Sequence, residues 1–331
     1  MEPGDLGAAP KAPRASLRGV WVGRLSLLLL LLLLLGAVGF GAVQCIRFVI
    51  ASNNATSNTI KCGTDWCPVR FEDAPVLPRC GGDLRTGLTD ETRPFLQSVV
   101  NFLAGFIDAT WSGRAPPELR GMRRLALIQS PDEAQPLGVL SAIEQESGAA
   151  VLAFRGTQTF VDLKEDLRMH QVAFEFGGQI HSGFSQAYLA VKQPVLEALR
   201  AASPPLTRLV VCGHSLGAAL AVLVSASVAS LMPGLELSLV CFACPRIGDA
   251  AFCRAVEALV PLHVRVQNEA DVIPGLPPAV FPNMRRLSAP WFYGHAGVPV
   301  SYQANWFSAT NNHNVANYWS FLHGSPAADG R

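Results

Sequence analysis

The feature that most constrains the fold is an apolar stretch that leads directly into a Gly-x-Ser-x-Gly pentapeptide and then into a run of small residues. Leu209–Cys212 has the composition of a buried strand, the pentapeptide GHSLG spans residues 213–217, and Leu216–Met232 has the length of a helix that ends at a Pro-Gly pair. When a strand turns sharply into a helix at a serine, the hydroxyl is exposed at the edge of the sheet, and the flanking glycines leave room for the turn. The pentapeptide alone occurs often by chance, but in this position it predicts that Ser215 is a nucleophile.

Strands and helices alternate on both sides of this serine. The short apolar runs Val139–Ile143 and Ala149–Phe154 are separated by the segment EQESG and predict a hairpin. Beyond the serine we expect a strand over Leu235–Ala243, a helix over Asp249–Leu259 and a further strand over Leu262–Val266. This alternation predicts an α/β fold with a mostly parallel sheet that is covered by helices on both faces.

A long apolar run near the N-terminus predicts a membrane-spanning segment. Leu25–Val43 contains no charged residue and includes an unbroken run of leucines, and at about 1.5 Å per residue it matches the hydrocarbon thickness of a bilayer. Basic residues precede it, so the positive-inside tendency keeps the N-terminus in the cytosol and sends the rest of the chain across the membrane. We therefore expect a signal-anchor. The alternative is a signal peptide, cut for instance after Ala37-Val38-Gly39, which would yield a secreted protein.

We expect four regions along the chain. Residues 1–24 form a basic cytosolic tail, residues 25–46 form the anchor, and residues 47–89 form a lumenal or extracellular stalk or irregular extension. Residues 90–331 form the folded domain. It begins with an amphipathic helix over Asp90–Trp111, in which apolar residues recur at intervals of four, three and four.

The stalk carries two features that depend on export from the cytosol. Cys62, Cys67 and Cys80 lie close together in the sequence. A disulfide such as Cys62–Cys67 is expected there, with the pairing left open. Asn54, in Asn-Ala-Thr, is a glycosylation acceptor if this segment is lumenal.

Four further cysteines lie in apolar surroundings, where we expect small buried core residues: Cys212, Cys241, Cys244 and Cys253. Cys241 and Cys244 have the C-x-x-C spacing of metal and redox sites. Residues three apart in a strand point to opposite faces, however, so we expect neither kind of site here.

A serine hydroxyl becomes an effective nucleophile only beside a base, here a histidine that a carboxylate orients. In this type of fold the order along the chain is serine, then the acid, then the histidine. Asp271 follows the predicted strand HVRVQ and is the expected acid. The alternative, Asp249, is expected to cap the helix that follows it.

Four histidines follow the serine. His263 precedes the expected acid and lies inside a predicted strand, and His323 is close to the C-terminus. His313 lies on a polar loop from which an imidazole could reach the serine. His295 precedes an alternating apolar strand and is expected to be structural, so His313 is the expected base.

Six short motifs occur in order along the chain. They are LAFRGT (Leu152–Thr157), HSGF (His181–Phe184), GHSLGAALA (Gly213–Ala221), NEADVIPGLPP (Asn268–Pro278), YGHAG (Tyr293–Gly297) and HNVANY (His313–Tyr318). In order and approximate spacing they resemble the motifs of the fungal-type class 3 lipases, over about residues 120–325. The resemblance implies an α/β-hydrolase fold and cleavage of carboxylic esters of lipids, with Ser215, Asp271 and His313 at the positions of the family's triad.

The oxyanion of a tetrahedral intermediate needs hydrogen-bond donors. One expected donor is the backbone N–H of Leu216, next to the nucleophile, and the resemblance adds Thr157 through its N–H and hydroxyl. It also places a short helical lid in QTFVDLKEDLRMHQ. The candidate apolar residues of this lid are Phe160, Val161, Leu163 and Leu167. Leu163 stands where the family often has tryptophan and the segment is polar, so we expect a covering lid without strong interfacial activation.

We therefore expect a membrane-anchored serine hydrolase that cleaves lipid esters, an acylglycerol lipase, with no metal or organic cofactor. Phospholipase A1 and mono- or diacylglycerol lipase activities at the same site are alternatives. A non-catalytic lipase-like scaffold is disfavoured, because it would not need all five site residues. The expected partners are a lipid ester and a membrane. The net charge of +1, from 26 basic and 25 acidic residues, excludes a nucleic-acid-binding protein. The oligomeric state is left open.

Overall fold

The structure is a computed structural model that describes residues 88–111, 121–130, 136–144, 146–156, 170–283, 289–305 and 308–324. The predicted tail, the anchor and all but the last two residues of the stalk lie outside the described residues, together with Asn54 and the three stalk cysteines. Among the helices that the structure describes, none is both long enough and apolar enough to cross a bilayer.

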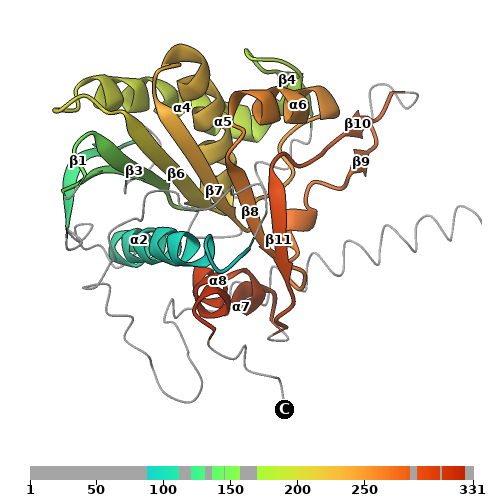
Figure 1. Cartoon of the computed structure of the whole chain (residues 1–331). Coiled ribbons are helices and arrows are strands. Elements are labelled where there is room, and N and C mark those ends of the chain that lie inside the picture. The colour runs from blue at the N-terminus through green and yellow to red at the C-terminus, as the bar shows by residue number, and fades with distance from the viewer. Residues whose placement is uncertain are drawn as a thin grey trace, which may run out of the picture. The chain divides into compact units, whose positions relative to one another are not determined.

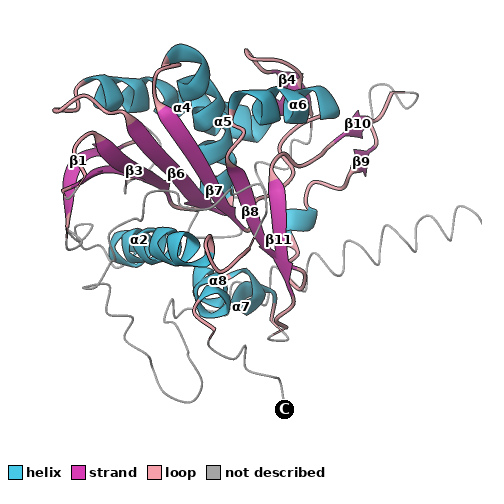
Figure 2. Ribbon diagram, viewed as in Figure 1, coloured by secondary structure: helices cyan, strands magenta, loops and turns pink. Residues whose placement is uncertain are grey.

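The described residues fold around a mixed sheet with the strand order β1-β2-β3-β6-β7-β8-β11 (Figure 2). Its strands are β1 (Met122–Ile128), β2 (Gly138–Ile143), β3 (Ala149–Phe154), β6 (Arg208–His214), β7 (Glu236–Phe242), β8 (His263–Asn268) and β11 (Val298–Tyr302). From β3 to β11 every neighbouring pair is parallel, whereas β1, β2 and β3 pair antiparallel. The predicted hairpin, β2 and β3, therefore joins the parallel part of the sheet to its antiparallel edge. The edge strand β1 was not predicted.

Helices cover both faces of this sheet (Figure 1). One face carries α4 (Ser182–Arg200), α5 (Leu216–Leu231) and α6 (Ala250–Leu259), and the other carries α2 (Arg93–Trp111), α7 (Ala309–His313) and α8 (Val315–Leu322). The smaller elements are β4 (Gln171–Ala173) with β5 (Gln179–His181), β9 (Val280–Phe281) with β10 (Trp291–Phe292), and the 3-10 turn η3 (Ile273–Gly275). The predicted α/β arrangement with two covered faces is confirmed. The long helix α4 was not predicted.

The helix α5 approaches the sheet closely because its first residues are small. A Cβ added at Gly217 would lie 2.4 Å from the carbonyl oxygens of Phe154 and Arg155, which is closer than any side chain tolerates. The alanines of its first two turns are fully buried. A helix that is apolar around its circumference belongs in the interior, and α5 is buried between the sheet and its neighbours α4 and α6. Its start is therefore fixed against the ends of β3 and β6.

The cysteines of the folded domain differ from the prediction in one respect. All four are free and buried, as expected of core residues. However, Cys241 and Cys244 do not point to opposite faces, because both belong to the core between the sheet and α5. The strand β7 ends at Phe242, and Ala243 has a positive φ of 53°. The alternation of side chains along the strand therefore stops before Cys244.

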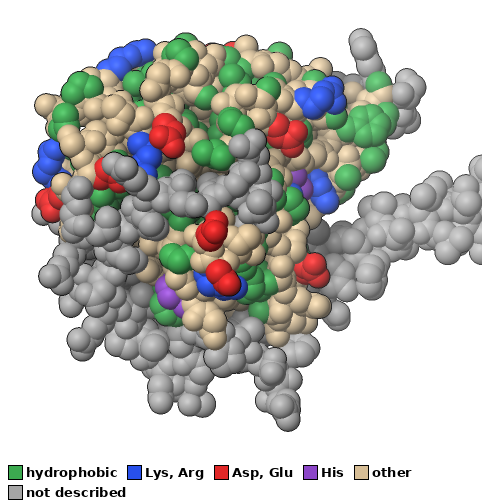
Figure 3. Space-filling model, viewed as in Figure 1, with side chains coloured by type: hydrophobic (Ala, Val, Ile, Leu, Met, Phe, Trp, Pro, Cys, Tyr) green, Lys and Arg blue, Asp and Glu red, His purple; other side chains and the backbone are tan. Residues whose placement is uncertain are grey.

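The surface carries charges of both signs. On the face drawn in Figure 3, acidic and basic side chains are interspersed, and the coloured part shows no patch of a single sign. This distribution agrees with the near-zero net charge of the chain.

The substitution Leu103→Ala in α2 tests how much the layer of helices α2 and α8 contributes to the free energy of unfolding. The Leu103 side chain is fully buried, so Leu103→Ala should lower the free energy of unfolding by about 2–5 kcal/mol, through lost apolar contact and the cavity left behind. The measurement is urea unfolding followed by circular dichroism. The control is Leu189→Ala in α4, where the side chain is 63% exposed and little change is expected. Equal effects of the two changes would contradict this packing.

Candidate active site

Ser215 lies at the sharp turn between β6 and α5. Its backbone has φ 60° and ψ −126°, a conformation that costs energy for any residue with a side chain. Its N–H donates to the carbonyl of Phe242, at the end of the neighbouring strand β7, over 3.0 Å. A Cβ at Gly213 would lie only 2.1 Å from the carbonyl oxygen of Gly217, so the turn requires both glycines. The strain is therefore held in place by the surrounding backbone.

The Ser215 hydroxyl does not act as a helix cap. Serine at the residue before a helix usually accepts a hydrogen bond from the first turn, but Ser215 makes no such bond. Its Oγ lies 2.8 Å from His313 Nε2 instead. The serine is thus oriented toward a base and away from the helix that it precedes.

The structure brings together the three residues that the sequence selects. His313, the last residue of α7, has its Nδ1 2.8 Å from Oδ2 of Asp271, which follows β8. With Nδ1–H donating to the carboxylate, Nε2 carries the lone pair that accepts the Ser215 hydroxyl proton. All three side chains are buried. The row Ser215–His313–Asp271 has the connectivity of a serine-hydrolase triad.

Asp271 is held in its charged form by several donors. Burial by itself would raise the pKa of Asp271, but His313, the Tyr318 hydroxyl and the N–H of Ile273 outweigh it and lower the pKa. Tyr318 donates to Oδ2 over 2.6 Å, and Ile273 donates to Oδ1 over 3.0 Å. A carboxylate that stays ionised can orient an imidazole and stabilise its protonated form.

Tyr318 and Asn268 support the site without having been predicted. Tyr318 lies within the motif HNVANY, but nothing local to that motif indicates that its hydroxyl reaches the acid. Asn268, the last residue of β8, donates through Nδ2 to the carbonyls of Ala304 and Asn312. An asparagine at the end of a buried strand is the signal that could have drawn attention to it.

The structure describes only one of the two predicted oxyanion donors. Leu216 is the first residue of α5, where a backbone N–H has no acceptor within the helix itself. Thr157 lies outside the described residues, as do the lid candidates Phe160, Val161, Leu163 and Leu167. The residue before Thr157 is close to the nucleophile, since a Cβ at Gly156 would lie 3.0 Å from Ser215 Cβ.

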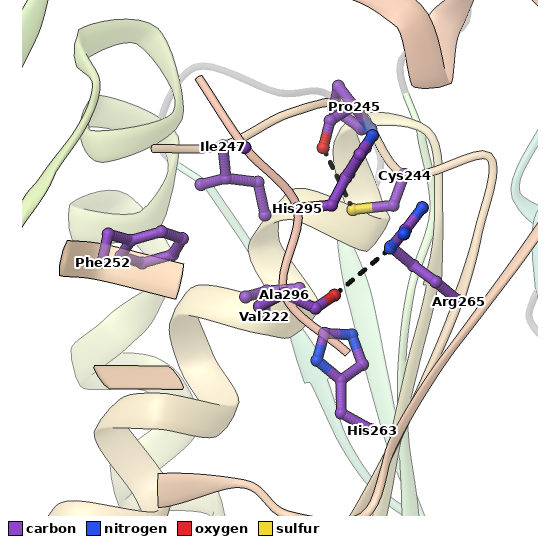
Figure 4. A pocket seen from close by; sticks show the side chains of 10 residues that line it. Val222, Cys244, Pro245, Ile247, Phe252, His263, Arg265, His295 and Ala296 are labelled. Atoms are coloured by element: carbon purple, nitrogen blue, oxygen red, sulfur yellow. Dashed lines mark hydrogen bonds between the residues drawn. The ribbon is translucent and has the colours of Figure 1, made fainter. Parts of the chain in front are cut away.

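Asp249, His263 and His295, which were not chosen as the acid or the base, have other surroundings. Asp249 accepts the N–H of Phe252 and caps α6, as predicted. His295 donates through Nε2 to the carbonyl of Pro274 over 2.9 Å. His263 and His295 line a separate cavity of about 10 Å³ with Arg265 and Cys244 (Figure 4). None of these groups contacts Ser215.

Comparison with known proteins relates part of this chain to lipases. Residues 151–281 match the family described as Lipase (class 3). This segment is less than half of the chain, and over it the chain is similar to class 3 lipases. The matched segment contains Ser215 and Asp271, while His313 lies beyond it.

Two sequence relatives and one solved structure illustrate the likeness. The lipase of Rhizomucor miehei is 31% identical over 137 residues, covering 39% of this chain and 38% of the relative. Phospholipase A1-II 4 of Oryza sativa subsp. japonica is 43% identical over 79 residues, covering 22% of this chain and 19% of the relative. The structure of the Rhizomucor miehei triacylglyceride lipase matches with a TM-score of 0.52 at 21% identity, over 65% of this chain and 81% of that chain. The described domain therefore has the α/β-hydrolase fold. The matched part spans less than two fifths of the length of either sequence relative.

Buried neutral histidines make the folded domain sensitive to acid. Burial lowers the pKa of His214 and of His263 to about 3, whereas an unfolded histidine titrates near 6.5. Their stability contribution is fully present above pH 6.5. Below it the unfolded chain binds protons that the folded chain does not, so the free energy of unfolding should fall by about 1.4 kcal/mol per pH unit for each histidine, down to about pH 3.

Urea unfolding at pH 7, 6, 5 and 4 checks this expectation. The variant His263→Asn should show a shallower pH dependence than the wild type, because one titrating group is removed. An unfolding free energy that stays constant from pH 7 to pH 5 would contradict the burial of these imidazoles in neutral form.

Proposed function

We propose that this chain is a membrane-anchored serine hydrolase that cleaves carboxylic esters of lipids. The observation that carries the proposal is the row of hydrogen bonds from Ser215 through His313 to Asp271, built on a strained turn between β6 and α5. The similarity of residues 151–281 to class 3 lipases supports the choice of lipid esters.

The proposed reaction passes through an acyl-enzyme. Ser215 Oγ attacks the ester carbonyl carbon while its proton moves to Nε2 of His313. Asp271 holds the Nδ1–H and stabilises the imidazolium. The C–O bond to the alcohol then breaks, and His313 delivers its proton to the leaving oxygen. A water molecule attacks the acyl-enzyme in the same way, with His313 as base, and releases the fatty acid.

The proposed oxyanion hole combines the N–H of Leu216 with the N–H and hydroxyl of Thr157. The start of α5 supports the first donor, because its N–H groups point out of the helix end and carry its partial positive charge. The closeness of Gly156 to Ser215 supports the second donor. Each such donor contributes about 2.7–4 kcal/mol to stabilisation of the transition state.

Acylglycerols are the proposed substrates, with mono- or diacylglycerols included. Phospholipids are the second candidate, because one relative is named a phospholipase A1 and its 79 aligned residues are 43% identical to this chain. Both substrate classes carry a carboxylic ester next to a glycerol carbon, so the same triad serves either one.

The membrane and the segment after Thr157 complete the proposal. We propose that residues 25–46 anchor the protein with the hydrolase domain lumenal or extracellular, and that cleavage of this segment to give a secreted enzyme is the alternative. Residues 158–171 are proposed as a lid with the apolar residues Phe160, Val161, Leu163 and Leu167. A tether beside a bilayer suits an enzyme whose substrates reside in one.

Labelling with a fluorophosphonate probe tests the nucleophile. The full chain in a non-ionic detergent should be labelled and should hydrolyse p-nitrophenyl esters. Ser215→Ala should abolish labelling and lower kcat by about 10⁴-fold or more, since no other group can form the acyl-enzyme. The matched control is Ser225→Ala, also in α5, whose buried hydroxyl has no hydrogen-bond partner among the described residues. Hydrolysis by Ser215→Ala at the wild-type rate would disprove the proposal.

A pair of histidine variants tests the base. His313→Ala should lose turnover by about 10³-fold or more at an unchanged fold, because the serine proton then has no acceptor. His295→Ala should keep its turnover at low temperature but melt earlier, because the hydrogen bond to the Pro274 carbonyl is lost. Ester hydrolysis and thermal melting are measured on both variants. The opposite pattern would exchange the roles of the two histidines.

A further inference from the structure

His214 directly precedes Ser215, and its side chain reaches the segment that carries the proposed base. Its Nε2 lies 2.8 Å from the backbone carbonyl oxygen of His313. The two imidazole rings lie 4.7 Å apart, tilted by 37°. A single side chain therefore joins the peptide of Ser215 to the backbone of His313, although the two segments are 99 residues apart in sequence.

The hydrogen bond defines the protonation state of His214. A carbonyl oxygen only accepts, so Nε2 carries the proton and donates. Burial, followed by the nearby His313, lowers the pKa of His214 to about 3, so the ring is neutral and Nδ1 holds a lone pair. During the proposed reaction His313 becomes positively charged. A neutral ring beside it adds no repulsion, whereas a second imidazolium would.

His313 needs such support because its own secondary structure is short. It ends the five-residue helix α7, and Asn314 leaves the helical conformation directly afterwards. Two consecutive carbonyls at this end are held by side chains from the ends of strands. Asn268 at the end of β8 donates to the carbonyl of Asn312 over 3.2 Å, and His214 at the end of β6 donates to that of His313.

The other surroundings of His214 are also part of the site. The ring packs edge-on against Tyr318, which donates to Asp271. Among the described residues, its buried Nδ1 has no hydrogen-bond partner, and a Cβ added at Gly156 would lie 3.7 Å from it. His214 thus contacts the backbone of the proposed base, the tyrosine that holds the acid, and the loop that leads to Thr157.

We propose that His214 is a positioning residue that holds the backbone of His313 and thereby keeps Nε2 of His313 at reacting distance from Ser215. This inference rests on the proposed function, because it concerns the same triad. Since His214 and Ser215 are adjacent, any shift of the turn carries the base along with the nucleophile. Movements elsewhere in the chain then leave the distance between Ser215 and His313 unchanged.

Two substitutions of different length separate this role from simple packing. In His214→Gln the amide N–H can take the place of Nε2–H and donate to the His313 carbonyl. In His214→Asn the side chain is too short to reach that carbonyl. Loss of the contact should lower kcat by about 10- to 100-fold in His214→Asn with KM within about twofold, because misplacement of a reacting group mainly slows the chemical step. His214→Gln should restore kcat to within about threefold of the wild type.

The experiment uses the full chain in detergent, with ester hydrolysis, the rate of fluorophosphonate labelling and thermal melting measured on each variant. The matched control is His263→Asn, because His263 is equally buried and neutral but does not contact the triad. It should melt earlier than the wild type with kcat unchanged at 20 °C. If both asparagine variants lose kcat only in proportion to their folded fraction, or if His214→Gln is as slow as His214→Asn, the positioning role is disproved.

The controls distinguish this failure from failure of the proposed function. If the wild type is neither labelled nor active on any ester, the proposed function fails and His214 has no triad to position. If the wild type is active and depends on Ser215, while His214→Asn retains wild-type kcat, the proposed function stands and only the inference about His214 is overturned.

Discussion

The site depends on how closely the start of α5 approaches the ends of β3 and β6. The carbonyl of Gly217 lies where a Cβ of Gly213 would be, and a Cβ of Gly217 would meet the carbonyls of Phe154 and Arg155. Only glycine permits these approaches, and they force Ser215 into its positive-φ turn. The hydroxyl makes no cap hydrogen bond to α5 and lies 2.8 Å from His313 Nε2 instead. The close contact of the start of α5 with the ends of β3 and β6 therefore fixes the position of Ser215.

Near this turn the interior contains an ionised carboxylate, Asp271, and a neutral imidazole, His214. Asp271 is buried yet ionised, because its two oxygens accept hydrogen bonds from His313, Tyr318 and the backbone of Ile273. His214 is buried and neutral, and it donates to a backbone carbonyl. The ionised carboxylate accepts the Nδ1–H of His313 and so orients the imidazole between itself and the serine. The described geometry is therefore suited to proton transfer from Ser215 to His313.

The family comparison and the geometry cover different parts of the site. The matched segment, residues 151–281, includes the turn at Ser215 and the acid Asp271. It ends before His313, so the choice of base rests on the 2.8 Å distances to its two neighbours. Likeness to a triacylglyceride lipase structure at 21% identity establishes the fold. The proposed lipid substrate rests on the similarity to class 3 lipases together with the predicted anchor.

The sequence by itself determined the features that depend on neighbours along the chain. The strand, the Gly-x-Ser-x-Gly turn, the helix after it, the hairpin of β2 and β3, and the cap at Asp249 follow from periodicity and turn chemistry, which act over a few residues. Chain order and motifs had already selected His313 as the partner of Ser215. Only the tertiary structure decided which other distant groups meet. The contacts of Asp271 with Tyr318 and of His214 with the His313 carbonyl, between residues 47 and 99 apart, were not predicted. The side of Cys244 was mispredicted, because Ala243 leaves the strand conformation. Such contacts depend on how whole strands and helices pack, and no local pattern records that packing.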